Sequence, residues 1–243
     1  MKAPFLARKL HKWIALIIGV QVLFWMVSGA YMATVNIDFI HGDSLVKNVN
    51  RPLDDNLPLL YSVSAVLEQF PDAIQVDLVS RLDEPHYIVT HESSTALLNA
   101  TSGETVSPLG RDTAIELAEY YYAGEGVVSN ANLLTGDSEK PSEIQTRPLP
   151  LWQVRFDDAI ATTFYVSPTT GELVTRRHSF WRLYDFLWMF HIMDYENRSD
   201  INNNLLRVAA FFGFALALSV GWLLFHALKR RKIIASAADF AGT

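Results

Sequence analysis

Two long uncharged apolar runs constrain what this 243-residue chain can fold into. The first covers residues 13–35 and the second covers residues 208–228. At about 1.5 Å per residue, a helix over either run reaches roughly 30 Å, which matches the hydrocarbon thickness of a bilayer. The sequence therefore predicts two antiparallel transmembrane helices, at 13–35 and at 207–228.

A cleaved signal peptide is the alternative for the first run, because basic residues precede it. The apolar region of a signal peptide typically has about 7 to 15 residues and ends at a small-x-small cleavage site. This run is longer and ends in SGAYMATV, without an A-x-A site. We therefore favour a retained membrane anchor over a cleaved signal.

Charge predicts the orientation of the two helices. Basic residues cluster in the tails at 1–12 and 229–243, so the positive-inside rule places both tails in the cytoplasm. The central domain at 36–178 must then lie outside. Residues 36–207 contain 12 Lys or Arg against 25 Asp or Glu, a balance of −13 that the overall charge of −6 hides. An acidic outer domain argues against nucleic acid as a partner.

Several kinds of chemistry are excluded or have no support. The chain has no cysteine, which excludes disulfides, thiolate metal sites and thiol catalysis. It has no P-loop, dinucleotide-binding glycine motif, zinc-protease motif or nucleophile elbow. Asp157 and Asp158 could bind a cation, but such a pair is more typical of a solvated loop. Trp152 and Phe156 fit the core face of a strand. We predict no catalytic residue and no metal site.

The central domain contains a loose internal repeat. Apolar residues at i, i+3, i+4 and i+7 predict a short helix at 63–70, which Pro71 stops, and another at 114–121. Asp112 is the predicted N-cap of the second helix, and Gly124 marks its end. Strand-like segments follow the helices at 74–79, 87–92, 96–99, 151–156 and 162–166.

Two matching glycine turns close the units of this repeat, at 101–104 and 169–172. The helices are offset by 51 residues and the turns by 68, so the second unit carries an insertion of about 17 residues. The polar stretch at 124–150 is its predicted place, as a loop or an edge excursion. Each unit, at about 57–110 and 111–178, is predicted to be one helix on an antiparallel hairpin or small meander. This is an α+β fold.

The repeated units resemble a known family. Tandem helix–hairpin units that end in YVSPTTGELV resemble PepSY domains. Their turn often reads D-x-x-T-G-E, whereas SPTTGE at 167–172 lacks the aspartate. The segments LHKWIALIIGVQVLFWMVSGAYM and RRHSFWRLYDFLWMFHIMD resemble the PepSY-associated transmembrane family, so the resemblance covers nearly the whole chain. It implies a bacterial inner-membrane protein with a periplasmic central domain.

Two histidines are predicted at matched depth in the membrane. His11 lies two residues before the first run, and His226 lies two residues before the end of the second. Because the helices run in opposite directions, both imidazoles reach the cytoplasmic boundary. A low-spin b-type haem takes two axial ligands, and neutral imidazole serves well. The alternative is that both are interfacial residues at the level of the lipid headgroups.

A third histidine, His191, lies in an aromatic segment at 179–196 that is predicted to be an interfacial helix. Arg182 and Asp185 share one face of this helix, and His191 lies on the opposite side. An unpaired polar ring is costly in apolar surroundings. The ring therefore needs a partner: a backbone carbonyl, a residue at the outer end of the spans such as Tyr31, or a haem iron.

The resemblance adds a cofactor to these expectations. In ferric-siderophore reductases of the resembled family, membrane histidines of the LH-[KR]-W and LH types are associated with b-type haem. In this chain LHKW contains His11, and MFHIMD contains His191. Longer members have four spans, whereas two are predicted here, so a homodimer could be needed to complete the ligand set.

Three functions remain open. The first is a transmembrane electron carrier, with haem b held by His11, His191 and His226, between a cytoplasmic reductase and ferric iron or a ferric chelate. Such a protein would be at most a ferric-reductase-like or electron-transfer subunit. The second is a non-catalytic, membrane-tethered PepSY binding or inhibitory module. The third is an accessory subunit of a membrane complex, which the small residues Gly213, Ala217 and Gly221 favour. All three include the lipid bilayer as a partner.

Overall fold

The chain divides into two compact units. The computed structural model describes residues 3–48, 61–218, 221 and 225. The first unit, here called the helical unit, comprises Met1–Thr34 and Tyr184–Thr243. The second, here called the sheet unit, comprises Val35–Leu183. The predicted α+β class with antiparallel sheets is confirmed.

The helical unit begins with the long helix α1 (Ala3–Thr34). Its segment Ala15–Thr34 is long and apolar enough to cross a membrane, by length and composition. Only 6% of its most apolar stretch is buried within the chain, so it is not covered as the core helix of a soluble protein would be. The second predicted span, 207–228, is described in part, as an apolar helix at Asn204–Leu218.

Helices α1 and α5 of this unit pack through aromatic side chains. Helix α5 (Ser179–Ile192), predicted from the aromatic segment, stacks Phe190 on Phe24 of α1, with ring centroids 5.0 Å apart. The following helix is N-capped by Asn203, whose Oδ1 accepts the N–H of Leu206 at 2.8 Å. These contacts hold the described helices of the unit together.

The first repeat of the sheet unit is a helix on a three-stranded antiparallel sheet of order β1-β2-β3. Its elements are α3 (Val63–Gln69), β1 (Gln75–Arg81), β2 (Glu84–Thr90) and β3 (Thr95–Asn99). Before it lie α2 (Ile37–His41) and the short 3-10 helix η1 (Asp43–Leu45). Val66 of α3 is fully buried against Val89 and Leu98, so α3 covers one face of this sheet. The predicted helix and three strands are confirmed, with shifted ends.

The second repeat is a helix on a four-stranded antiparallel sheet of order β4-β5-β6-β7. Its elements are α4 (Arg111–Tyr121), β4 (Val127–Leu134), the 3-10 helix η2 (Ser142–Ile144), β5 (Leu151–Asp157), β6 (Thr163–Val166) and β7 (Leu173–Arg177). Leu117 of α4 packs in one core with Val154 and Phe164. Trp152 and Phe156 lie in the same core, as predicted.

Three details of the second repeat differ from the sequence predictions. The stretch 124–150 contains the edge strand β4 and the helix η2, besides loop. Strand β7 was not predicted. Asp112 is not the N-cap of α4, because the helix begins one residue earlier and Gly110 occupies the cap position without a side-chain bond. Asp112 lies in the first turn, where a carboxylate still interacts favourably with the helix dipole.

The two glycine turns share one hydrogen-bond pattern. In each, the first residue accepts backbone N–H groups two and three positions later through its side chain, Asn99 in one turn and Ser167 in the other. Gly103 and Gly171 each bond back to that residue's carbonyl, at 2.8 and 2.9 Å, with φ of 76° and 65°. Such positive φ favours glycine. Asn99 and Ser167 thus supply the equivalent side-chain acceptor in the two turns.

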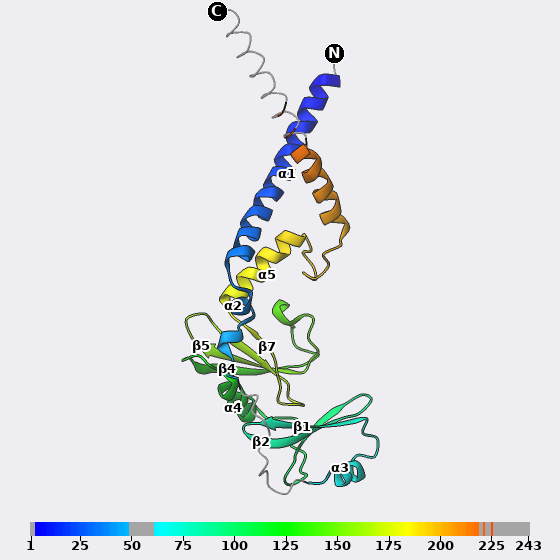
Figure 1. The fold of residues 1–243 in the computed structure, drawn as a ribbon, viewed down its shortest axis with the longest axis vertical. Helices are drawn as coiled ribbons and strands as arrows, with labels where there is room; N and C mark the ends of the chain where they lie inside the picture. Colours follow the sequence, from blue (N-terminus) through cyan, green and yellow to red (C-terminus); the bar gives the residue numbers. More distant parts are fainter. Residues whose placement is uncertain (1–2, 49–60, 219–220, 222–224, 226–243) are drawn as a thin grey trace, which may run out of the picture. The chain divides into compact units, whose positions relative to one another are not determined.

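Helix α4 belongs to the cores of both repeats. Leu97 of β3 is 1% exposed and lies in the same core as Leu117 and Val154, and Ile88 of β2 packs against that core. Figure 1 shows α4 between the two sheets. The first sheet is therefore covered by α3 on one face and by α4 on the other. The second sheet has α4 on one face. On its opposite face Ile144 of η2 packs with Leu151 and Tyr165, so the connection between β4 and β5 covers part of that face.

Candidate functional site

The end of α5 is held by three side chains of the helical unit. Gln21 donates to the carbonyl of Phe190 at 3.1 Å, and Trp25 donates to the carbonyl of His191 at 2.8 Å. Asn203 donates to the carbonyl of Ile192, also at 2.8 Å. The last carbonyls of a helix lack intrahelical partners, so these donors complete the hydrogen bonding of α5 and fix its position against α1.

The imidazole of His191 bonds to a buried serine. Its Nδ1 lies 2.8 Å from Oγ of Ser28, which is 1% exposed. The Ser28 hydroxyl has one proton and donates it to the carbonyl of Phe24 at 2.7 Å. With the Ser28 hydroxyl assigned as the donor to Phe24, Ser28 Oγ accepts from His191; this tautomer has its proton on Nδ1 and its lone pair on Nε2. Among the described residues, no hydrogen-bond partner reaches that nitrogen.

The imidazole of His191 lies beside Gly29 of α1 and Trp188 of α5. A Cβ added at Gly29 would lie 3.9 Å from Cε1 of His191, so the imidazole sits close to the backbone of α1. Trp188 of α5 lies parallel to the ring, with centroids 6.3 Å apart. The hydrogen-bond partner of the ring on α1 is thus Ser28, three residues before Tyr31. The sequence shows this serine in SGAYM but gives no sign of its partner, 163 positions away.

The structure does not describe the side chains of the other two candidate haem ligands, His11 and His226. The backbone of His11 lies in α1, whereas its side chain and all of His226 lie outside the described residues. His11 precedes Ser28 by 17 residues on one helix, which separates their levels by about 25 Å. His11 and His191 therefore cannot ligate one iron within one chain.

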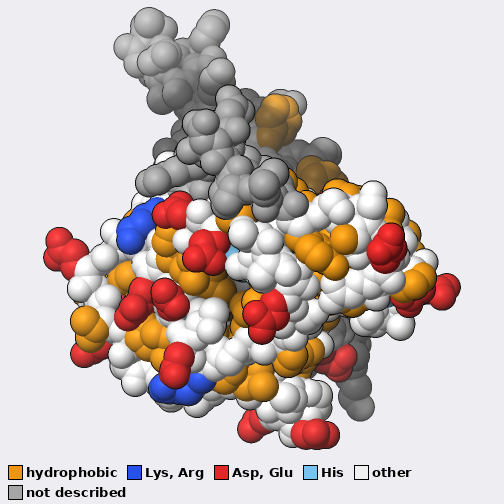
Figure 2. Space-filling model, turned by 90° about the horizontal axis from the view of Figure 1, so that it is seen from below, with side chains coloured by type: hydrophobic (Ala, Val, Ile, Leu, Met, Phe, Trp, Pro, Cys, Tyr) orange, Lys and Arg blue, Asp and Glu red, His pale blue; other side chains and the backbone are white. Residues whose placement is uncertain are grey.

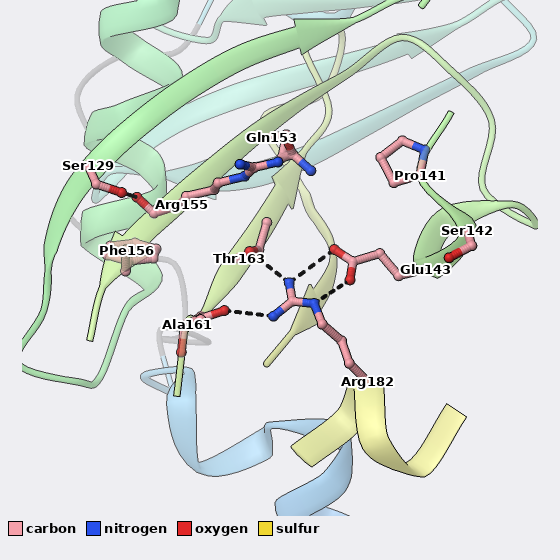
Figure 3. Close-up of a pocket in the computed structure, with 11 residues that line it drawn as sticks. Ser129, Pro141, Ser142, Glu143, Gln153, Arg155, Phe156, Ala161, Thr163 and Arg182 are labelled. Carbon is pink, nitrogen blue, oxygen red and sulfur yellow. Dashed lines mark hydrogen bonds and ion pairs between the residues drawn. The ribbon is translucent and has the colours of Figure 1, made fainter. Parts of the chain in front are cut away.

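The sheet unit contains a pocket of about 500 Å³ on the face of its second sheet opposite α4. Gln153, Arg155 and Thr163 line it, and they alternate along β5 and β6 with the core residues Val154 and Phe164. The pocket is also lined by Ser129, Pro141, Ser142, Glu143, Phe156, Ala161, Thr162 and Arg182 (Figure 3).

An ion pair builds one wall of the pocket. Nε of Arg182 donates to Glu143 Oε2 at 2.6 Å, and Nη2 donates to Oε1 at 3.2 Å. Nη2 also reaches Thr163 Oγ1 at 3.0 Å, and Nη1 reaches the carbonyl of Ala161 at 2.9 Å (Figure 3). The bidentate pair joins α5 to η2 within the sheet unit.

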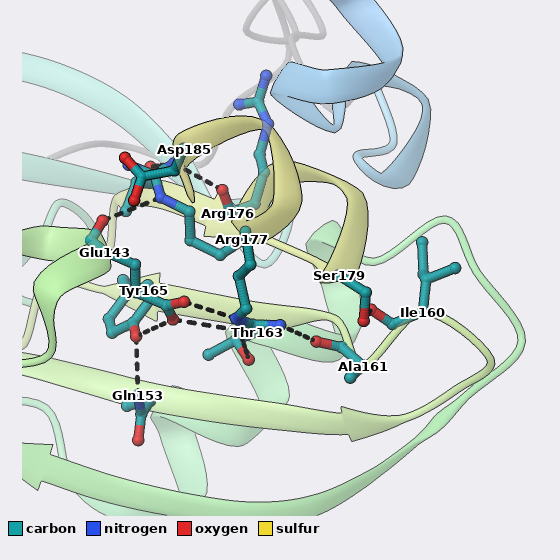
Figure 4. Close-up of polar contacts among 12 residues, drawn as sticks. Glu143, Gln153, Ile160, Ala161, Thr163, Tyr165, Arg176, Arg177, Ser179 and Asp185 are labelled. Carbon is teal, nitrogen blue, oxygen red and sulfur yellow. Dashed lines mark hydrogen bonds and ion pairs between the residues drawn. The ribbon is translucent and has the colours of Figure 1, made fainter. Parts of the chain in front are cut away.

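A buried phenol extends this ion pair into the sheet. The hydroxyl of Tyr165, which is fully buried, donates to Glu143 Oε1 at 2.6 Å and accepts from Gln153 Nε2 at 2.8 Å (Figure 4). Burial and the hydrogen bond to the Glu143 carboxylate raise the pKa of Tyr165, so the phenol stays neutral. Each oxygen of Glu143 thus accepts from Arg182, and one also accepts from Tyr165.

Arg155 is the charged group of the pocket without a counterion. Its side chain is exposed on β5, and no described residue forms an ion pair or side-chain hydrogen bond with its guanidinium. The hydroxyls of Ser129 and Ser142 line the same pocket. Sequence analysis did not single out Glu143, Arg155 or Gln153. Polar and apolar residues alternate in LWQVRFD, which puts Gln153 and Arg155 on the strand face opposite the apolar one. This alternation is the sequence signal for these two residues.

Two groups considered for a site are structural. His178 is fully buried, and its Nε2 donates to the carbonyls of Phe39 and Ile40 at 3.0 and 3.1 Å. Burial lowers the pKa of His178 despite these bonds, which favours the neutral ring. Asp158 is not a purely solvated acid, because it accepts the hydroxyl of Tyr122 at 2.7 Å and two loop N–H groups.

The hydrogen bond between Asp158 and Tyr122 shifts the pKa of both side chains. Burial opposes ionisation of Asp158, but hydrogen bonds from Thr162, Tyr122 and the loop backbone outweigh it and lower its pKa. Burial and the bond to this carboxylate raise the pKa of Tyr122 to about 12. The pair therefore fixes the loop between β5 and β6.

Comparisons with known protein families, with curated proteins and with solved structures find no match to this chain. In the part of the chain that the structure describes, no three His, Asp or Glu side chains gather closely enough to hold a metal ion. The His191 site and the second-sheet pocket are therefore the two candidate functional sites of the chain.

Proposed function

We propose that the chain is a membrane-anchored electron carrier in which His191 ligates a b-type haem. The observation that supports this most strongly is the 2.8 Å contact between His191 Nδ1 and Ser28 Oγ, which, with Nδ1 assigned as the donor, leaves a lone pair on Nε2. Histidines that bind metals usually donate their other ring N–H to an oxygen acceptor, which fixes the tautomer and the ring orientation. Ser28 supplies that acceptor from α1.

The residues around His191 fit an axial ligand. Neutral imidazole is a common haem ligand, and the hydrogen bonds from Gln21 and Trp25 limit movement of the helix end that carries it. A bound haem would supply reversible one-electron chemistry. His11 and His226 are the proposed ligands at the other level of the membrane. At the level of His191, a second copy of the chain would complete the set of residues that hold the haem.

The remaining parts of the proposal concern topology. The apolar segment Ala15–Thr34 supports membrane insertion, and the basic tails support a cytoplasmic location for both termini. We place the second span at 207–228 and the sheet unit, as two PepSY-like repeats, in the periplasm of a bacterial inner membrane. Electrons would pass from a cytoplasmic reductase to ferric iron or a ferric chelate.

A reduced-minus-oxidised absorption spectrum tests the proposal. Full-length protein produced with ample haem should show the bands of a b-type haem, and His191→Ala should lose part of them. Ser28→Ala should weaken haem retention by about tenfold or more, because it removes the acceptor that orients the ring. His41→Ala, which removes an exposed histidine of α2, is the control. Absence of a Soret band in the parent would end the proposal.

A tethered binding module without redox chemistry is the second candidate. The pocket on the second sheet favours it, because the pocket has polar walls and an unpaired guanidinium. On this account His11 and His226 are structural, and replacing them changes stability alone. An accessory subunit of a membrane complex would instead copurify with its partners from native membranes.

A further inference from the structure

We propose that the pocket on the second sheet binds a small ligand through a carboxylate, with Arg155 as its main contact. This inference goes beyond the proposed function and does not require haem. The volume of about 500 Å³ lies within the range of small-molecule sites. The ligand class follows from the charges, the hydrogen bonds and the first repeat.

The first repeat shows what the pocket face would be if it served packing. Ile88 and Leu97 lie directly opposite one another in the first sheet, and both pack against the core that contains α4. The corresponding pair in the second sheet is Gln153 and Tyr165, which also lie directly opposite one another. This pair is polar, and it is hydrogen-bonded to itself and to Glu143. Packing alone does not need polar groups at these positions.

The charges of the pocket select an anion. Two guanidinium groups, of Arg155 and Arg182, line it with one carboxylate, of Glu143. Glu143 is already paired with Arg182 and bonded to Tyr165, so it has little capacity to attract a cation. Arg155 remains unneutralised, in a region of the sequence where acidic residues outnumber basic ones. The face in Figure 2 likewise carries many acidic and few basic side chains.

The geometry of a guanidinium favours a carboxylate. Its planar fork donates two parallel N–H bonds to the two oxygens of one carboxylate. The Ser142 hydroxyl can bond other polar atoms of the ligand, whereas Ser129 already donates to the carbonyl of Arg155 at 3.1 Å and offers its oxygen as an acceptor. The network of Arg182, Glu143 and Tyr165 holds the opposite wall in place, so the pocket is organised before a ligand enters.

Calorimetric titration of the full-length protein in detergent tests the inference. Two probes distinguish the source of the carboxylate: citrate, as a free organic acid, and triglycine, as a peptide with a free carboxyl end. Triglycine amide is the uncharged comparison. Saturable binding of citrate, of triglycine or of both supports the inference. If triglycine binds, triglycine amide should bind at least about tenfold more weakly. Affinity should fall as chloride concentration rises.

Variants distinguish binding in the pocket from non-specific attraction of the anion to any exposed arginine. Arg155→Gln should weaken binding by about tenfold or more, and Arg155→Lys should recover part of it because charge returns without the fork. Arg147→Gln removes another exposed arginine, outside the pocket lining, and should leave affinity unchanged. Near-ultraviolet circular dichroism checks that each variant is folded. No saturable binding of either probe by folded parent protein, or equal losses in Arg155→Gln and Arg147→Gln, would overturn the inference.

Discussion

The two sheets of the sheet unit are built alike and used differently. In the first, the pair Ile88 and Leu97 packs against the core of α4. In the second, the corresponding pair Gln153 and Tyr165 forms hydrogen bonds beside a pocket. Gln153 and Tyr165 are themselves buried, and buried polar groups are tolerated where they bond to one another, as these do with Glu143. The connection between β4 and β5 covers part of this face and leaves the rest as the pocket.

The connection between the first two strands of each repeat makes the difference possible. Strands β1 and β2 are joined by residues 82–83 alone, whereas residues 135–150 join β4 to β5. The longer connection carries Glu143 of η2 to the polar face, where it meets Arg182 and Tyr165. The insertion therefore supplies the carboxylate that satisfies the polar pair.

The largest effect is expected where the first sheet packs. Leu97→Ala should lower the free energy of unfolding by about 2–5 kcal/mol, because it removes a side chain 1% exposed and leaves a cavity. Thermal unfolding of the full-length protein, followed by tryptophan fluorescence, measures it. Leu67→Ala, at an exposed position of α3, is the control and should cost far less. Similar losses for both would contradict the packing assigned to Leu97.

The next effect is expected from the ion pair of the second sheet. Glu143→Gln should lower the free energy of unfolding by about 1–3 kcal/mol, because Arg182 loses its charged partner. It should also lower the pKa of Tyr165 relative to the parent, although burial still keeps that pKa above its ordinary value. Ultraviolet titration of tyrosine ionisation measures the second change. Glu116→Gln, at an exposed position of α4, should change neither, and an unchanged tyrosine titration in Glu143→Gln would contradict the network.

A smaller effect is expected when the second sheet is made like the first. Gln153→Leu should change the free energy of unfolding by less than about 1.5 kcal/mol, because volume is kept and Tyr165 still donates to Glu143. The same thermal unfolding experiment measures it. A loss as large as that of Leu97→Ala would mean that the two sheets do not differ as described.

The smallest effect at neutral pH is expected at His178, which joins α2 to the end of β7. Burial lowers the pKa of His178 below the ordinary 6.5, so the unfolded chain takes up this proton first as pH falls. The stabilisation from the neutral ring is complete above about pH 6.5 and decreases below it. His178→Gln can still donate to the carbonyls of α2 and should make stability fall less steeply over this range. Identical pH dependence of thermal unfolding in parent and variant would contradict this assignment.

The sequence predicted the regular elements with strong periodicity. The helices α3 and α4 follow apolar spacing, α5 follows the aromatic segment, and α1 follows its long apolar run. The polar residues of β4 (VVSNANLL) and the basic residues of β7 (LVTRR) obscured those strands, because edge strands need fewer apolar residues. Their existence depends on pairing with β5 and β6, which local sequence does not encode.

The candidate sites were less accessible from sequence than the fold. His191 was singled out as a polar ring in an apolar segment, and its need for a partner was correctly inferred. The identity of that partner, Ser28, depends on how α5 packs against α1. Arg155 was not singled out, because an arginine on a strand becomes informative only when its neighbours are known. Whether His11 and His226 lie near one another remains a prediction, since their side chains lie outside the described residues.

Electron paramagnetic resonance of the oxidised full-length protein tests the central claim most directly, because the signal of low-spin ferric haem reports its axial ligands. We predict a low-spin signal typical of two imidazole ligands in the parent and in His41→Ala. Part of that signal should disappear in His191→Ala. Identical low-spin signals in parent and His191→Ala, or no haem signal in haem-replete protein, would contradict the account.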